Sequence, residues 1–177
     1  MRRLLLLLGA LLVTPLVGHG REATVVVIDF DMLDTSLQGE MEGPNKADLA
    51  RLEKTEAQIR RELDASKAFR VVNNEKTARI MKGLRENQVH LHDCNLCEIR
   101  AGKAVDADYV LVGWVQKVSN LILNLNVALR QVPGGEDIVG SSVDMRGNTD
   151  EAWSRAGTYL VQRELLPEFT EVSANSQ

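Results

Sequence analysis

The sequence predicts an α/β domain built on a mixed five-stranded sheet, with strands and helices in the order β-α-β-α-α-β-β-β-α along the chain. Three segments predict this class. Residues 24–30 are a continuous apolar, β-branched run, typical of a strand buried on both faces. Residues 46–65 place apolar side chains on one face at helical spacing. Residues 121–129 alternate between apolar and polar side chains, as expected of a strand with one buried face.

In the first half of the domain, strands alternate with helices. An acidic loop is predicted over residues 31–44, and the helix over about 46–65 follows it. Residues 69–72 form the second predicted strand. Asn73-Asn74 are suited to cap a second helix, because asparagine side chains accept the free N–H groups of a first turn. A strand, a helix and a strand in this order imply a parallel pair of strands with a right-handed crossover.

The second half begins with a short predicted helix over residues 96–105. Three strands follow, joined by tight turns, and they are expected to form an antiparallel meander. The last helix is predicted to start near Asn148 or Thr149 and to stop at Pro167, because proline cannot continue a helix. The three strands of the meander are predicted over residues 109–118, 121–129 and 139–145.

The two ends of the chain are predicted to lie outside this domain. Residues 1–20 have the basic start, the short apolar run and the small residues before a cleavage site that are typical of a secretory signal peptide. Thr14-Pro15 interrupt the apolar run before it reaches the roughly 20 residues that span a bilayer, and no later segment is apolar enough. We therefore expect one α/β domain over residues 21–167, a flexible polar tail over 168–177, and a periplasmic protein.

Charge excludes one class of partner. The chain has 21 basic and 25 acidic residues, and loss of Arg2 and Arg3 with the signal peptide leaves 19 basic residues and a net charge of −6. Nucleic-acid-binding domains are usually basic, so we do not expect nucleic acid as a partner.

Both cysteines lie in the segment His90-x-His92-x-Cys94-x-x-Cys97. The spacing of Cys94 and Cys97 fits a structural disulfide in an oxidising compartment, or the active pair of a thiol/disulfide oxidoreductase. The alternative is a metal site formed by His90, His92, Cys94 and Cys97, with Asp93 as an alternate ligand, for which zinc or copper is chemically suited. Covalent haem is excluded, because Glu98 stands where haem attachment requires histidine.

The acidic loop contains a second candidate cluster. Asp29, Asp31 and Asp34 are closely spaced, and oxygen ligands of this kind can bind hard cations such as calcium. The residues do not follow the spacing of an EF-hand, and Leu33 does not fit the phosphatase nucleophile pattern. We therefore interpret the cluster as a solvated loop beside the end of a strand.

A set of polar side chains accompanies the predicted meander. Amide and cationic groups on an open sheet face can hold a peptide or a partner domain, and the alternative is the ordinary solvated side of an antiparallel sheet. Trp114 and Trp153 are interpreted as core residues. The candidate partner-binding residues are Gln116, Lys117, Asn124, Asn126 and Arg130.

Two resemblances extend this interpretation. Residues 25–30, 69–72 and 107–115 resemble, in fold and spacing, the amino-terminal domain of the translocation protein TolB and the periplasmic domain of curli-export lipoproteins. A closer resemblance, over nearly the whole mature chain, is to a family of small secreted proteobacterial proteins known only as a domain of unknown function. The segments that carry it are Asp34-Thr35-Ser36-Leu37, Cys94-x-x-Cys97-Glu98, Trp114 to Asn124, and Arg146 to Asp150 with Trp153 and Arg155.

The resemblance to this family implies an accessory role, because its members often accompany genes for periplasmic quinoprotein alcohol dehydrogenases and their cytochromes. The residues show no complete catalytic motif. We therefore expect a periplasmic protein that is not an enzyme, carries no certain cofactor and binds a protein partner, such as an exported quinoprotein or cytochrome system. The alternatives are a metal-binding or metal-delivery protein that uses the histidine and cysteine segment, and a thiol/disulfide oxidoreductase that works through Cys94 and Cys97.

Overall fold

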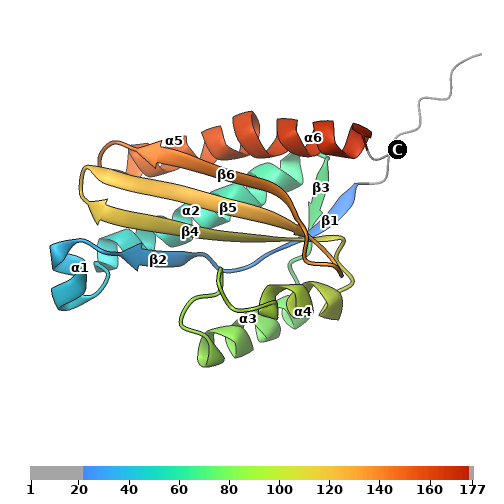
Figure 1. Cartoon of the computed structure of the whole chain (residues 1–177), viewed down its shortest axis with the longest axis horizontal. Coiled ribbons are helices and arrows are strands. Elements are labelled where there is room, and N and C mark those ends of the chain that lie inside the picture. Colours follow the sequence, from blue (N-terminus) through green and yellow to red (C-terminus); the bar gives the residue numbers. More distant parts are fainter. Residues whose placement is uncertain (1–21, 176–177) are drawn as a thin grey trace, which may run out of the picture.

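A computed structural model describes residues 22–175, so the predicted signal peptide lies outside the described residues. This part of the chain forms an open mixed sheet with helices on both faces (Figure 1). None of its helices combines the length and the apolar character needed to cross a bilayer. The strands are β1 Ala23–Val27, β2 Asp31–Asp34, β3 Phe69–Val71, β4 Tyr109–Ser119, β5 Ile122–Gln131 and β6 Asp137–Met145.

The sheet has the order β3-β1-β4-β5-β6, and β2 also pairs with β4. Strand β1 is parallel to both β3 and β4, whereas β4, β5 and β6 are antiparallel. The structure therefore confirms the mixed sheet and the meander in the C-terminal half.

Strand β2 is a sixth strand that the sequence did not predict, because residues 31–44 were expected to be a loop. β4 is 11 residues long, but β1 covers only Tyr109–Leu111 of its edge. β2 continues the same edge, in parallel register with residues 114–117 of β4. Gly113 lies opposite the gap between β1 and β2, where a Cβ atom would overlap the ring of Phe30. The chain thus leaves the edge of β4 at the end of β1 and returns as β2, which pairs with the rest of that edge.

The predicted helices are confirmed, and side-chain caps explain where three of them start. Asn45 caps the helix over residues 46–65, Asn74 forms a capping box with Thr77, and Thr149 caps the first C-terminal helix. A short additional helix follows Ser36, which caps it. The helices are α1 Leu37–Glu42, α2 Lys46–Ala65, α3 Glu75–Asn87, α4 Cys97–Ala104, α5 Asp150–Tyr159, the π-helix η1 Leu160–Leu165, and α6 Leu166–Asn175.

The prediction of a flexible tail over residues 168–177 is wrong for residues 168–175, because α6 extends to Asn175. Pro167 does not stop the helix, because the turn before it is a π-helix in which the Leu166 N–H donates to the Val161 carbonyl. A π-turn is wider than an α-turn and gives the proline ring room that an α-helix would not. Phe169 holds α6 to the sheet by packing against Phe69, with ring centroids 4.4 Å apart.

Each face of the sheet has its own apolar core. One core lies between the sheet and α2, α5, η1 and α6, and it includes the buried Trp153. The other lies between the sheet and α3 and α4, and it includes the buried Leu91. Figure 1 shows that α3 and α4 cover only one end of their face. The distal parts of β4, β5 and β6 are therefore open to solvent on that side, where Gln116 and Asp144 are exposed.

We expect Phe169→Ala to lower the free energy of unfolding by about 3 kcal/mol, because it removes a buried ring and leaves a cavity against Phe69. Thr170→Ala, on the exposed side of the same helical turn, should change it by no more than about 0.5 kcal/mol. Urea unfolding of both variants measures the difference. Equal stabilities would mean that the C-terminal segment is not packed on the domain.

Candidate functional site

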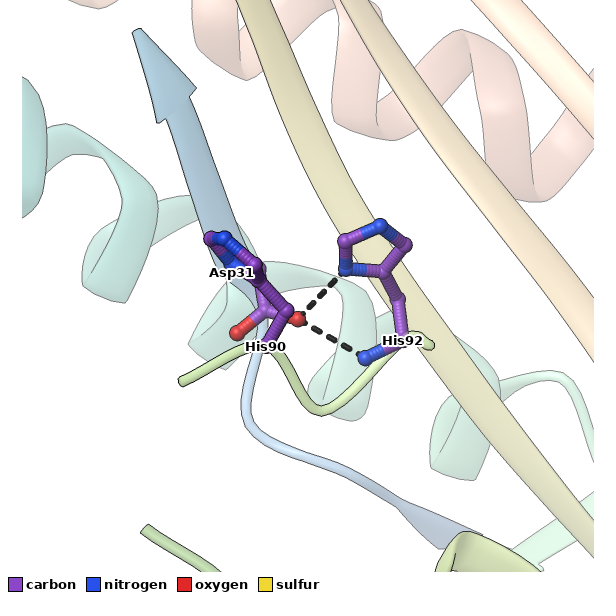
Figure 2. Close-up of side chains that lie close together, drawn as sticks. All are labelled: Asp31, His90 and His92. Atoms are coloured by element: carbon purple, nitrogen blue, oxygen red, sulfur yellow. Dashed lines mark hydrogen bonds and ion pairs between the residues drawn. The ribbon is translucent and has the colours of Figure 1, made fainter. Parts of the chain in front are cut away.

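The loop between α3 and α4 brings two histidines to the start of β2. Leu91 is fully buried and anchors the loop, so that His90 and His92 lie on either side of it, near Asp31 (Figure 2). The His92 backbone N–H donates to Asp31 Oδ2 at 2.8 Å, and His92 Nδ1 lies 2.7 Å from the same oxygen. One nitrogen from each histidine and one carboxylate oxygen of Asp31 lie within 4.8 Å of one another.

Asp31 is buried, with 3% of its surface exposed, although the sequence analysis placed it in a solvated loop. Arg85 on α3 donates to Asp31 Oδ1 at 2.7 Å and to the Phe30 carbonyl at 2.7 Å. Burial alone would raise the pKa of Asp31, but the hydrogen bonds from His92 and Arg85 outweigh it and hold the pKa below its ordinary value of 3.8. The carboxylate is therefore kept charged in the interior.

Trp114 fixes the ring of His92. The two rings stack with centroids 4.9 Å apart and an interplanar angle of 22°. Trp153 is a core residue as predicted, but Trp114 is not, because it lies on the sheet face that α3 and α4 leave partly open and is only half-buried. Cross-strand pairing explains its position, since Trp114 pairs with Asp31 of β2.

The four side chains predicted as one metal site are not brought together. Cys94 and Cys97 form a disulfide at the start of α4, and both are buried. His90 and His92 gather around Asp31 instead. A buried disulfide is poorly accessible to a thiolate from another protein, so this geometry favours the structural disulfide over the oxidoreductase pair.

A groove of about 880 Å³ runs beside β2. Its floor is β2 itself, one wall is the first half of α2, and the other is formed by α3 and the loop that follows it. Leu49 is 39% exposed and Val89 is 84% exposed, so the groove presents apolar surface to solvent. The lining residues are Asp29, Phe30, Asp31, Met32, Leu33, Asp34, Thr35, Pro44, Leu49, Leu52, Glu53, Glu56, Arg85, Val89 and His90.

A buried ion cluster joins β4 to the groove. Lys117 Nζ donates to Asp48 Oδ2 at 2.7 Å and to Asp34 Oδ2 at 3.1 Å, and all three side chains are at most 2% exposed. Asp48 also accepts from Arg51 and Asn148. Burial alone would raise the pKa values of Asp34 and Asp48, but hydrogen bonds outweigh it and lower both pKa values. For Asp34 the main hydrogen bonds come from Ser36 and then Lys117. For Asp48 they come from Lys117 and then Asn148.

Five residues were predicted to bind a partner on the open face of the sheet, and for Lys117 this prediction is wrong. Lys117 lies on the opposite face from Gln116, and its ammonium group is paired within the buried ion cluster. Arg130 is partly covered, because it donates to Glu98 at 2.6 Å and to Asp137 at 2.8 Å. Gln116 is exposed and Asn124 and Asn126 are half-buried, and cross-strand pairing places these three on the open face.

The groove was not predicted from the sequence because its floor, β2, was not predicted. The signal was weak, since Asp31-Met32-Leu33-Asp34 does not alternate between apolar and polar residues. The alternation of β4 did contain the signal for Lys117, because Val115 and Lys117 are two residues apart and therefore share a face.

The chain resembles known proteins in both sequence and structure. The model of the DUF3280 family, described as a protein of unknown function (DUF2380), matches residues 23–165, which confirms the expected resemblance to a family of unknown function. Comparison with the curated proteins finds no match.

The comparison of structures finds the following three solved structures among its matches. The match to the LpoB C-terminal domain from Salmonella enterica has a TM-score of 0.52 at 18% identity, and it covers 73% of this chain and 86% of the LpoB chain. Lipoprotein GNA1162 from Neisseria meningitidis has a TM-score of 0.45 at 14% identity, with 87% and 95% covered. TolB from Acinetobacter baumannii, also expected, has a TM-score of 0.48 at 12% identity, with 84% and 28% covered. At 18% identity, the likeness to the LpoB domain shows a shared fold alone.

We expect Lys117→Met to lower the free energy of unfolding by about 3–5 kcal/mol at neutral pH, because it leaves Asp34 and Asp48 buried without their shared cation. The native protein should lose stability as the pH falls below 3.8 and through the depressed pKa values of these carboxyls. The variant should lose less on acidification, because protonation relieves its uncompensated charges. Urea unfolding at about pH 7 and about pH 3 measures both effects.

The control for this variant is Lys54→Met, which removes a lysine of α2 that is 73% exposed. Its effect should stay within about 0.5 kcal/mol at both pH values. A Lys117→Met protein as stable as the control would show that the cluster contributes nothing to the fold.

We expect the double substitution Cys94→Ser and Cys97→Ser to cost about 2 kcal/mol of stability, as closure of so short a loop implies. The native protein should not oxidise a model dithiol at the expense of its own disulfide, because both cysteines are buried. Catalytic exchange that disappears in the double variant would instead identify an oxidoreductase.

Proposed function

The chain belongs to the DUF3280 family of proteins of unknown function, and we propose that it is a non-enzymatic accessory protein that binds an extended segment of a protein partner along β2. The observation that carries the proposal is the free edge of this strand at the floor of the groove. Among the described residues, β2 pairs with β4 on one side and with no strand on the other. An unpaired edge is a template for a strand from another chain.

The hydrogen bonds around β2 define which backbone groups face the groove. The Thr35 N–H donates to the Lys117 carbonyl at 2.8 Å, so Thr35 is directed toward β4. Alternate residues of a parallel strand face opposite edges, which directs the backbone groups of Met32 and Asp34 into the groove. The next such position, Phe30, is already occupied, because its N–H donates to Glu56 at 2.8 Å. A partner strand would therefore pair at Met32 and Asp34.

The walls of the groove indicate the chemistry of the partner. Leu49 and Val89 offer apolar contacts above the strand edge. Five carboxylates line the groove against one guanidinium, that of Arg85. Asp31 is neutralised by Arg85 and Asp34 by the buried Lys117, whereas Glu53 is exposed and forms no ion pair with a described residue. We therefore infer an extended partner segment with apolar residues and at least one lysine or arginine.

The proposed place of action is the periplasm. The disulfide between Cys94 and Cys97 is stable in an oxidising compartment, and the sequence of residues 1–20 predicts export. The partner class implied by the family resemblance is an exported quinoprotein dehydrogenase or its cytochrome. The open face with Gln116, Asn124 and Asn126 would extend the contact to the folded body of the partner.

The test is site-specific photo-crosslinking in cells that export the protein, with the crosslinking residue at Val89 in the groove. We expect a covalent adduct whose partner peptide is extended and contains a basic residue. Leu49→Lys should reduce the adduct about tenfold or more, because it places a charge on the apolar wall and repels a basic segment.

Two matched controls separate the groove from other exposed apolar sites. Tyr159→Lys changes a helical residue of similar exposure outside the groove and should leave the adduct unchanged. A crosslinking residue at Leu121, which is 74% exposed and does not line the groove, should give no adduct. An adduct from Leu121 alone, or one from Val89 that Leu49→Lys leaves intact, would contradict the proposal.

A further inference from the structure

The histidines beside the groove are arranged in a way that partner binding does not require. We propose that Asp31, His90 and His92 form a binding site for a divalent transition-metal ion of the zinc type. One ligand atom from each side chain lies within 4.8 Å of the other two. The site differs from the one that the sequence predicted, since Asp31 replaces the two cysteines, and it lies beyond the proposed partner binding.

Two of the three ligands are held in place before any ion arrives. Asp31 is fixed by Arg85, which donates to Oδ1 at 2.7 Å and leaves Oδ2 facing the histidines. His92 is fixed by its backbone hydrogen bond to Asp31 and by stacking on Trp114. Preorganised ligands lose little freedom on binding, and neighbouring groups that orient them raise metal affinity.

His90 would complete the site from the solvent side. It is exposed, its ring centroid lies 5.7 Å from that of His92, and it borders the groove together with Asp31. Figure 2 shows the His90 and His92 side chains and Asp31 gathered where the loop meets β2. The exposed position of His90 gives an ion a direct path from solvent. The coordination would be open on that side, as in metal sites with three protein ligands.

The ligand chemistry selects the class of metal. Both sulfurs are bound to each other in the disulfide, so the site offers two imidazoles and one carboxylate. This set suits Zn²⁺ and related ions rather than the soft ions that thiolates favour. The local charge also favours a cation, because the three carboxylates of Asp29, Asp31 and Glu56 outnumber the two guanidinium groups of Arg60 and Arg85 that pair with them. The ion would replace the hydrogen bond between the His92 ring and Asp31.

The experiment is calorimetric titration of the untagged, exported protein with Zn²⁺ after removal of metals by a chelator. We expect one Zn²⁺ per chain. His90→Ala should weaken binding about tenfold or more, the loss typical of altered metal sites, and should not disturb the fold because His90 is exposed. Zn²⁺ should also raise the melting temperature of the native protein but not that of the variant.

The matched control is Asp93→Asn, which removes an exposed carboxylate from the same loop without removing one of the three ligands. It should bind Zn²⁺ within about twofold of the native affinity, a difference of roughly 0.4 kcal/mol. Absence of saturable binding, or equal affinities of His90→Ala and Asp93→Asn, would overturn the proposal. Crosslinking in the presence of chelator tests the groove separately, so the two proposals can fail independently.

Discussion

The register between β2 and β4 is the constraint on which both functional surfaces depend. Asp31 pairs with Trp114, and Asp34 pairs with Lys117. Because side chains alternate along a strand, the first pair lies on the face with His92 and the second on the face covered by α2. A slip of one residue would exchange the faces of every side chain in β2. The Asp31 carboxylate would then leave Arg85 and His92, and Asp34 would leave the buried ammonium group.

Helices from both layers hold the chain where it passes from β1 to β2. Glu56 of α2 accepts the Phe30 N–H, and Arg85 of α3 donates to the carbonyls of Asp29 and Phe30. The backbone groups that a regular strand would have satisfied are thus satisfied by side chains. The same two helices form the walls of the groove, so the position of the walls and that of the free strand edge are set by one group of contacts.

Local signals explain most of what could be predicted from the sequence. Asparagine and threonine caps predicted the helix starts well, and strict alternation predicted β5, because both signals act within a few residues. Strand β2 could not be predicted in this way, since four residues without alternation become a strand only because a distant edge of β4 is unpaired. His90 and His92 could be predicted as candidate metal ligands from their type, but Asp31 lies 61 residues from His92 and could be placed beside them only by the fold. The continuation of α6 past Pro167 depended on a π-turn for which the sequence offered no signal.

The pairing of the earliest strands with β4 also has a consequence for the order of folding. Asp34 and Lys117 are 83 residues apart, whereas β4, β5 and β6 are joined by short turns. Contacts between distant residues form more slowly than local ones, because closing a long loop costs entropy before the contact is gained. We therefore expect the meander to form first and to serve as the template on which β1 and β2 dock. In that order, the metal ligands and the groove would be the last features of the domain to assemble.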